Sequence, residues 1–426
     1  MFQSLFSSEF RKNAAKLLSA NVISQAIALA VYPVVTRQYS PEEFGDFNIF
    51  MAICSVLFIA STGRYEGAIQ LPKSNRDAIA LFQVCLWIAT LFAALLLIII
   101  LCFKNLILTT FSIESIGWGI GFIPFLVLLN AIGVAWRSWT NRNKEFGSTG
   151  RYLITQNLTN SVAKIFFGFL KITRLGLLFS FTIGYFCSFL YIIRKKSEKK
   201  WTADLFRKDY KRMREIAAVY SNYPKYNMPL SVLNTFSSNI PLLLLAPFFE
   251  KNMIGFYSLA VTIGIRPITL FNNSMYNVFF QRISETYHKR EPIFPLLKKY
   301  FLTGISILLP TFVCIYIFSV PIVSQLFGKQ WAETATILNI LLPWFFATIF
   351  VKAFLFLPDI FFKQKKSMIL EIVCLILRSL ALIYGIYQND FYIAIIAFST
   401  VSFLTLFYQA GWYYRLVANY ERQLVK

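Results

Sequence analysis

The chain has 426 residues, of which 57% are hydrophobic and 15% are charged. Soluble domains carry about 25% charged residues, so this composition argues against a soluble globular protein and indicates a polytopic membrane protein. The formal net charge of +22 could suggest a nucleic-acid partner, but the distribution of the charge along the chain argues against one.

Twelve apolar segments are each long enough to cross a bilayer, which takes about 20 residues of helix. In chain order they are 14–36, 44–70, 79–103, 117–139, 152–172, 174–194, 225–248, 253–280, 300–327, 335–357, 367–388 and 391–415. We therefore expect an all-α integral membrane protein with about twelve transmembrane helices. The loops between these segments leave no room for a soluble catalytic domain.

Lysine and arginine are unevenly divided between the two sides that this topology defines. With the N-terminus inside, the cytoplasmic loops, tails and helix ends hold about 32 of the 42 basic residues, and the outer loops hold six. Because basic residues favour the cytoplasmic side, we expect a multi-pass protein with both termini in the cytoplasm. The basic cluster 194–214 then faces anionic inner-leaflet lipids rather than nucleic acid.

The two halves of the chain share a weak repeated pattern. Asn21, Pro33 and Gly45 recur in the same order as Asn227, Pro241 and Gly255. Six helices per half would make this repeat parallel, about an axis along the membrane normal. We predict two six-helix lobes, 1–194 and 225–426, joined by a basic cytoplasmic linker, 195–224. Coincidence is the alternative explanation.

Polar residues recur at helical spacing in the first half. The first predicted helix contains Gln25, which could line a polar lumen. In the fifth predicted helix, four residues follow one another at intervals of four and share one face: Tyr152, Gln156, Asn160 and Lys164. A basic side chain at mid-bilayer costs about 2.5 to 3.5 kcal/mol, so we expect Lys164 to face a cavity. For any single Asn, the alternative is an interhelical hydrogen bond without a binding role.

The second predicted helix has distinctive residues at both ends. Ser40 to Glu43 combines an N-cap serine, a proline at the first helical position and a glutamate at the third, which predicts a capping box. Near the inner end lie Arg64 and Glu66. A carboxylate inside the membrane is a candidate for proton or sodium coupling, and the alternative is that Glu66 only neutralises a nearby arginine.

Arg266 lies in the middle of the eighth predicted helix, directly before Pro267. Proline removes an amide donor and disfavours helical geometry at the preceding residue, so we expect a kink beside the cation. Asn273 on the same helix and Asn234 on the preceding one are further candidates for a polar lumen.

Arg378 lies equally deep in the eleventh predicted helix, seven residues after Glu371, the second carboxylate that could couple transport to an ion. The two residues share a face and are about 10 Å apart along the helix axis. Together with Lys164 and Arg266, Arg378 indicates an anionic cargo. We expect these three cations to point into one central cavity.

Motifs for nucleotide or metal chemistry are absent from the sequence. There is no GxxxxGK[ST] loop and no HExxH, and the one histidine is His288. The six cysteines form no CxxC pair. We therefore expect neither an enzyme nor a bound cofactor or metal.

Two segments resemble a known family. They are Arg64 to Lys73 (RYEGAIQLPK) and Tyr39 to Gly45 (YSPEEFG). Both are similar to segments of the Wzx-type polysaccharide flippases, which are bacterial proteins of the superfamily that also holds the MATE exporters and the lipid II flippase. The resemblance covers essentially the full chain and implies a twelve-helix, two-lobed fold in the bacterial inner membrane.

The resemblance implies a flippase that moves an undecaprenyl-diphosphate-linked oligosaccharide repeat unit to the periplasmic leaflet by alternating access, for O-antigen of lipopolysaccharide or another surface polysaccharide. Arg266, Lys164 and Arg378 would then bind the diphosphate. The glycan would meet four amide side chains: Gln25, Asn160, Asn234 and Asn273. The polymerase and the chain-length protein of the same pathway are the implied protein partners, and a proton or sodium gradient is the implied driving force.

Two alternatives stay open at this point. One is a MATE-like exporter or another transporter of lipid-linked precursors, although the basic lumen argues against export of organic cations. The other is a polytopic polysaccharide polymerase, which generally needs a larger outer loop than this chain has. The sequence does not determine the glycan.

Overall fold

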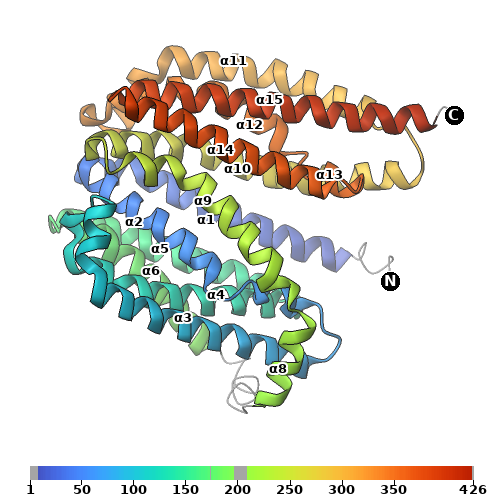
Figure 1. Ribbon diagram of the computed structural model, residues 1–426, viewed down its shortest axis with the longest axis horizontal. Coiled ribbons are helices and arrows are strands. Elements are labelled where there is room, and N and C mark those ends of the chain that lie inside the picture. Colours follow the sequence, from blue (N-terminus) through green and yellow to red (C-terminus); the bar gives the residue numbers. More distant parts are fainter. Residues whose placement is uncertain (1–7, 173, 196–208, 425–426) are drawn as a thin grey trace. The chain divides into compact units, whose positions relative to one another are not determined.

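The computed structural model describes residues 8–172, 174–195 and 209–424 (Figure 1). Nearly all of this length is helical, and these ranges contain no β-strand. The packing of the helices divides the chain into two compact units, Met1–Pro247 and Phe248–Lys426, called unit 1 and unit 2 below.

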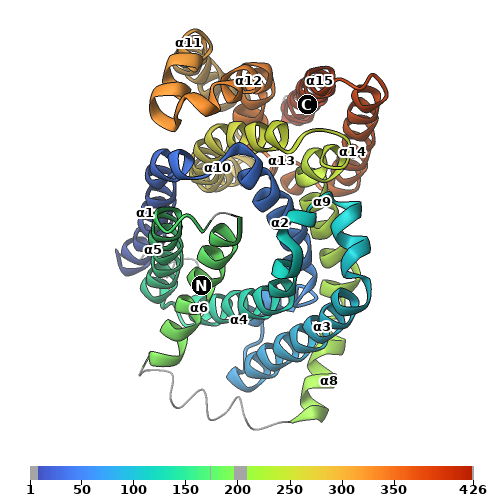
Figure 2. The same cartoon turned by 90° about the vertical axis from the view of Figure 1, so that its left-hand side faces the viewer.

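The described residues of unit 1 form eight α-helices and three short turns of other helix types. The α-helices are α1 (Ser8–Gln38), α2 (Pro41–Ala60), α3 (Asn75–Thr110), α4 (Phe122–Arg142), α5 (Phe146–Phe169), α6 (Arg174–Arg194), α8 (Tyr210–Val219) and α9 (Met228–Leu245). The short turns are η2 (Tyr65–Gln70), η3 (Glu114–Gly121) and η5 (Tyr223–Asn227). Helix α5 packs against α1 and α6, α3 packs against α4 and α8, and α2 packs against α9 (Figure 2).

Unit 2 is built around α15. Its elements are α10 (Lys251–His288), α11 (Phe294–Phe327), η6 (Lys329–Trp331), α12 (Glu333–Lys352), α13 (Leu357–Ile360), α14 (Gln364–Tyr387) and α15 (Phe391–Leu424). Helix α15 packs against α14 and α12, and α12 also packs against α10 and α11. Phe354, Phe356, Leu406 and Val417 are among the buried residues of its core.

The helices confirm the predicted all-α membrane fold, since each of the twelve predicted spans coincides with one long helix. In the described part of the chain, nine helical segments are long and apolar enough to cross a membrane by themselves. The three predicted spans outside this set are α1, α5 and α10, which carry Gln25, Lys164 and Arg266. Polar residues lower the hydropathy of these three helices.

One predicted span, 44–70, is too long. Helix α2 ends at Ala60, and the chain turns before η2 begins at Tyr65. Gly63 and Arg64 both adopt left-handed backbone geometry, with φ of 59° and 62°. That geometry is incompatible with a continuing α-helix. At its other end α2 begins with the predicted capping box between Ser40 and Glu43.

The residues of the predicted repeat occupy similar places in their helices. Pro33 lies inside α1 and Pro241 inside α9, each about one turn before the helix ends. Gly45 and Gly255 each lie at the fifth position of the helix that follows. Helix α10 extends without interruption through Pro267, and the kink expected there stays a prediction. The predicted repeat and its lobe limits of 1–194 and 225–426 stay predictions.

Part of the predicted linker 195–224 packs into unit 1. Met213 and Ile216 of α8 join a buried cluster with Leu81 of α3 and Trp136 of α4. Arg212 pairs with Asp77 at the start of α3, with 2.6 Å between Nη2 and Oδ1. Residues 196–208, at the centre of the predicted basic cluster, lie outside the described residues.

Asp209 anchors the start of α8 and gives a pH-dependent prediction. Its carboxylate accepts the backbone N–H of Arg212 at 3.1 Å and pairs with Arg76 at 2.7 Å. The backbone N–H, followed by Arg76, holds the pKa of Asp209 below its ordinary value. Since a lowered pKa stabilises the charged form, the contacts of Asp209 stabilise α8 above the ordinary carboxyl pKa of about 3.9. This stabilisation is lost as the pH falls through the lower, folded-state pKa.

We therefore expect Asp209→Ala to loosen α8 at neutral pH more than Asp209→Asn does. Asparagine keeps the helix cap and removes only the charge, whereas alanine removes both. Hydrogen exchange of the α8 amides measures the difference, and their protection in the wild type should fall only at acidic pH. Equal exchange in both variants and the wild type at pH 7 would contradict this role for Asp209.

The α14–α15 hairpin depends on the absence of a side chain at Gly385. A Cβ atom there would lie 2.2 Å from Ala394 Cα and 2.4 Å from its backbone nitrogen. Relief of this clash would require the backbone of one helix to shift, which is energetically costly. Gly385→Ala should therefore destabilise the protein by about 1 to 3 kcal/mol through overpacking, seen as a lower midpoint of thermal unfolding. The control is Gly147→Ala, because a Cβ at Gly147 meets open space. Equal midpoints for the two variants would disprove the expectation.

Candidate functional site: basic side chains inside the two units

Lys164 points into unit 1. Its ammonium lies over the rings of Phe47 in α2 and Tyr32 in α1, 5.2 Å and 5.8 Å from the ring centroids. The Tyr39 hydroxyl donates a hydrogen bond to the Lys164 carbonyl at 2.9 Å. Aromatic faces attract a cation by about 0.5 to 2 kcal/mol, which offsets part of the cost of holding the charge away from water.

The predicted polar stripe on α5 also turns toward its neighbours within unit 1. Tyr152 is buried, and Asn160 is half-buried with an Oδ1 atom that has no hydrogen-bond partner among the described residues. Two glycines allow this packing. A Cβ at Gly133 of α4 would lie 2.0 Å from the Tyr152 hydroxyl, and one at Gly184 of α6 would lie 2.9 Å from Asn160 Cβ.

Arg137 is a basic residue that the sequence analysis did not select, because it lies near a helix end. Its guanidinium carbon lies 5.7 Å from the centroid of the Tyr152 ring, at the other end of the α5 stripe from Lys164. The buried Nε atom of Arg137 has no hydrogen-bond partner in the described part of the chain. Lys164 and Arg137 are thus both placed against aromatic rings in unit 1.

The predicted amide residues of unit 1 have different surroundings. Gln25 is half-buried on α1, next to Ser24, whose hydroxyl donates to the Leu153 carbonyl of α5 at 3.1 Å. Asn234 is exposed on α9. The amide that connects α9 to α2 is Asn239, which donates to the Ser55 hydroxyl at 3.1 Å.

Glu66 is buried in the turn that follows α2. Its carboxylate accepts hydrogen bonds from the Thr62 hydroxyl at 2.5 Å and from Arg64 at 3.3 Å. The same turn contacts η5 of unit 1, since a Cβ at Gly67 would lie 3.1 Å from the Tyr223 ring. Glu66 therefore lies beside a cation, and its role in ion coupling stays a prediction.

A second buried carboxylate, Asp46 of α2, was missed by the sequence analysis. It is 1% exposed, accepts a hydrogen bond from the Ser115 hydroxyl and lies 3.3 Å from Arg174 Nε. Arg174 also pairs with Glu42, one helical turn before Asp46, at 2.6 Å. The spacing of Glu42 and Asp46 on one helix face was the available signal.

In unit 2, Arg266 is half-buried on α10. Pro267 has no amide N–H, so the carbonyl of Ile263 has no donor at the usual helical position beside this cation. Gly264 lies against Phe345 of α12, whose ring would be 2.2 Å from a Cβ at this position. The side chain of Asn273 lies outside the described residues.

Arg378 and Glu371 do not pair with each other in α14. Glu371 lies 3.7 Å from Lys352 of α12, and the two side chains are 29% and 35% exposed. Arg378 is half-buried, and its Nε atom has no hydrogen-bond partner among the described residues. The burial of this Nε atom shows that part of the guanidinium group is covered by the protein.

A pocket of about 360 Å³ opens beside Glu371. Thr405, Tyr408 and Gln409 of α15 form its polar side, and Cys374 and Leu377 are among the apolar residues of its lining. In the residues that the structure describes, no group of three His, Cys, Asp or Glu side chains could hold a metal ion. The expectation that Lys164, Arg266 and Arg378 share one cavity stays a prediction, because it concerns both units.

These features define a multi-pass membrane protein whose helix bundles hold basic side chains in their interior. Residues 34–336 match the family described as polysaccharide biosynthesis protein, and the chain belongs to this family. A search of curated proteins found no match.

Three solved structures of transporters share the fold. An inward-facing multidrug resistance transporter of the MATE family, in the MOP superfamily, is 15% identical with a TM-score of 0.69, over 93% of this chain and 96% of that one. The lipid II flippase MurJ in an inward closed conformation is 15% identical with a TM-score of 0.66, over 96% and 91% of the two chains. A MATE transporter of Vibrio cholerae is 14% identical with a TM-score of 0.58, over 98% of each chain.

Proposed function

We propose that this protein is a flippase that moves undecaprenyl-diphosphate-linked oligosaccharide repeat units across the bacterial inner membrane, for O-antigen or another surface polysaccharide. The observation that carries the proposal is the placement of Lys164 over aromatic rings, together with the buried guanidinium nitrogen of Arg378, inside helices of a polysaccharide biosynthesis protein. Inside a membrane, such cations usually serve a charged cargo. The likeness to MurJ in fold is consistent with a lipid-linked cargo.

The diphosphate is the part of this cargo that crosses the bilayer least readily without the protein. Its negative charges must leave the headgroup region, and Lys or Arg offers charge-assisted hydrogen bonds to phosphate oxygens. Half-buried amides such as Asn160 and Gln25 suit a glycan rich in hydroxyl groups. In this proposal the lipid tail stays in the bilayer, and the protein acts as a transporter and not as an enzyme.

The alternative of a MATE-like exporter of organic cations would need unpaired carboxylates. Glu66 and Glu371, the two carboxylates selected from the sequence, lie beside Arg64 and Lys352 instead. The buried Asp46 lies beside Arg174. This pairing favours an anionic cargo over a cationic one.

Arg266→Ala should abolish surface-polysaccharide export, because it removes a positive charge from the proposed diphosphate path. Arg266→Lys should restore part of the export, since charge is the primary need and guanidinium geometry is secondary. The measurement is the surface glycan of a flippase-deficient strain that carries each variant, with membrane insertion checked by immunoblot. Arg422→Ala, at an exposed position of α15, is the control. Normal glycan with Ala at position 266 would remove Arg266 from the mechanism.

Glu66→Gln should abolish the response of reconstituted flipping to a proton or sodium gradient, while slow downhill flipping continues. Glutamine keeps the shape and hydrogen bonding of the side chain but fixes its charge at zero, so an ion could no longer bias the conformational equilibrium. Glu371→Gln tests the second candidate in the same way.

The matched control for these variants is Glu43→Gln, because glutamine preserves the capping box of α2. If Glu66→Gln and Glu371→Gln, separately and combined, respond to both gradients as the wild type does, the two carboxylates only balance their basic neighbours.

A further inference from the structure

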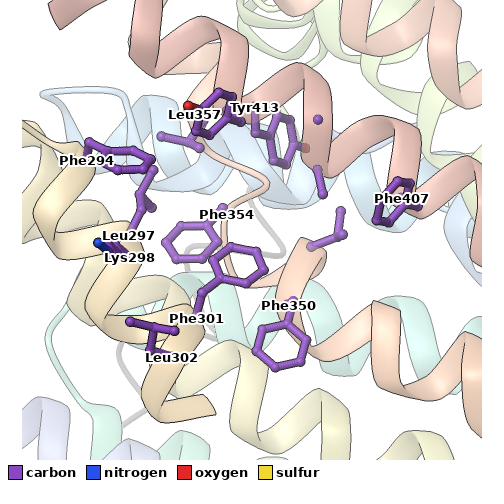
Figure 3. Close-up of a pocket in the computed structure, with 14 residues that line it drawn as sticks. Phe294, Leu297, Lys298, Phe301, Leu302, Phe350, Phe354, Leu357, Phe407 and Tyr413 are labelled. Atoms are coloured by element: carbon purple, nitrogen blue, oxygen red, sulfur yellow. The ribbon is translucent and has the colours of Figure 1, made fainter. Parts of the chain in front are cut away.

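Unit 2 carries an apolar pocket that the proposed transport path does not use. It has a volume of about 380 Å³ and lies between the first turns of α11, the end of α12 and the middle of α15 (Figure 3). Phe301 and Phe350 form part of its wall, with their rings stacked at 5.1 Å. Lys298 lies at its edge and is the one charged residue of the lining. The volume is in the range of small-ligand sites, about 300 to 1,000 Å³.

A second, basic pocket lies next to the apolar one. It has a volume of about 550 Å³ and is formed by the start of α14 and the same part of α15. Its three charged residues are all basic, namely Lys363, Lys366 and Arg415, and all three are exposed. The Lys366 ammonium is positioned over the Trp412 ring, 5.3 Å from the centroid.

The two pockets meet at one place on α15. Phe407 and Gly411 line both of them. A Cβ atom at Gly411 would meet nothing within 4 Å, so the helix has a notch where the pockets join. A single molecule could therefore place a polar group in the basic pocket and an apolar chain in the other.

We propose that this pair of pockets binds one anionic glycerophospholipid of the cytoplasmic leaflet. Its phosphate would accept hydrogen bonds from Lys363, Lys366 and Arg415. One acyl chain would pass the Gly411 notch and lie among the phenylalanine rings. The charge distribution of the sequence predicts that this end of unit 2 is cytoplasmic, which is the level of anionic headgroups.

The chemistry of the two pockets favours this occupant over simpler ones. A free phosphate would leave the apolar pocket empty, and a neutral lipid would gain nothing from three cations. The inference is independent of the proposed cargo, because the linings of the two pockets include none of the proposed lumen residues. A bound lipid here would hold α11, α12, α14 and α15 together.

The test is native mass spectrometry of the full-length protein, purified in detergent and titrated with phosphatidylglycerol or phosphatidylcholine. Each basic residue near an anionic surface contributes about fivefold in affinity, so Lys363→Gln, Lys366→Gln and Arg415→Gln combined should weaken phosphatidylglycerol binding on the order of 100-fold. Gly411→Phe should also reduce binding by blocking the notch. Helical circular dichroism and gel filtration check that each variant is folded.

The matched control removes the same number of charges from exposed positions outside both pockets, by Lys289→Gln, Arg290→Gln and Arg422→Gln. Retained phosphatidylglycerol binding in the control, with loss in both test variants, would support the proposal. Equal losses in test and control variants would show a diffuse charge effect and overturn it. So would equal binding of phosphatidylcholine, or displacement of the lipid by glycerol phosphate alone.

Discussion

The cost of holding a cation inside a bilayer is the constraint on which this structure depends. Even the lenient scale gives about 2.5 to 3.5 kcal/mol for a basic side chain at mid-membrane. The protein offsets part of this cost by turning Lys164 and Arg137 away from lipid and toward aromatic rings inside unit 1. Glycines at positions 133 and 184 let the neighbouring helices approach closely enough for that packing. Because a buried cation is energetically costly, its presence indicates a functional role for the positive charge.

The buried and half-buried carboxylates are also compensated for the loss of water. Glu66, Asp46 and Glu371 each lie beside a basic residue, so negative charge in these helices is balanced locally. The α5 stripe between Arg137 and Lys164 contains no carboxylate, so it keeps a positive bias. Under the proposed function, this positive bias suits a cargo that carries phosphate better than an organic cation, a distinction that fold similarity alone does not make.

Hydropathy predicted the twelve helices because it is a local property of the sequence, and helical spacing predicted that the polar residues of α5 share one face. The end of α2 was misplaced, because the left-handed geometry at Gly63 and Arg64 interrupts a stretch that remains apolar. The pairing of Glu371 with Lys352, the burial of Asp46 and the inward turn of Arg137 were not predicted. These contacts join residues on different helices, and a single sequence carries little information about which helices meet.

The central claim is that the interior cations serve the passage of a lipid-linked diphosphate. Its most direct test is a flipping assay with purified protein in liposomes that contain fluorescent undecaprenyl-diphosphate oligosaccharide, with a membrane-impermeant quencher outside. The account predicts that the protein makes the inner-leaflet pool accessible to the quencher, and that a fluorescent organic cation enclosed in the same liposomes is retained. Quenching no greater than in protein-free liposomes, together with protein-dependent release of the cation, would contradict it.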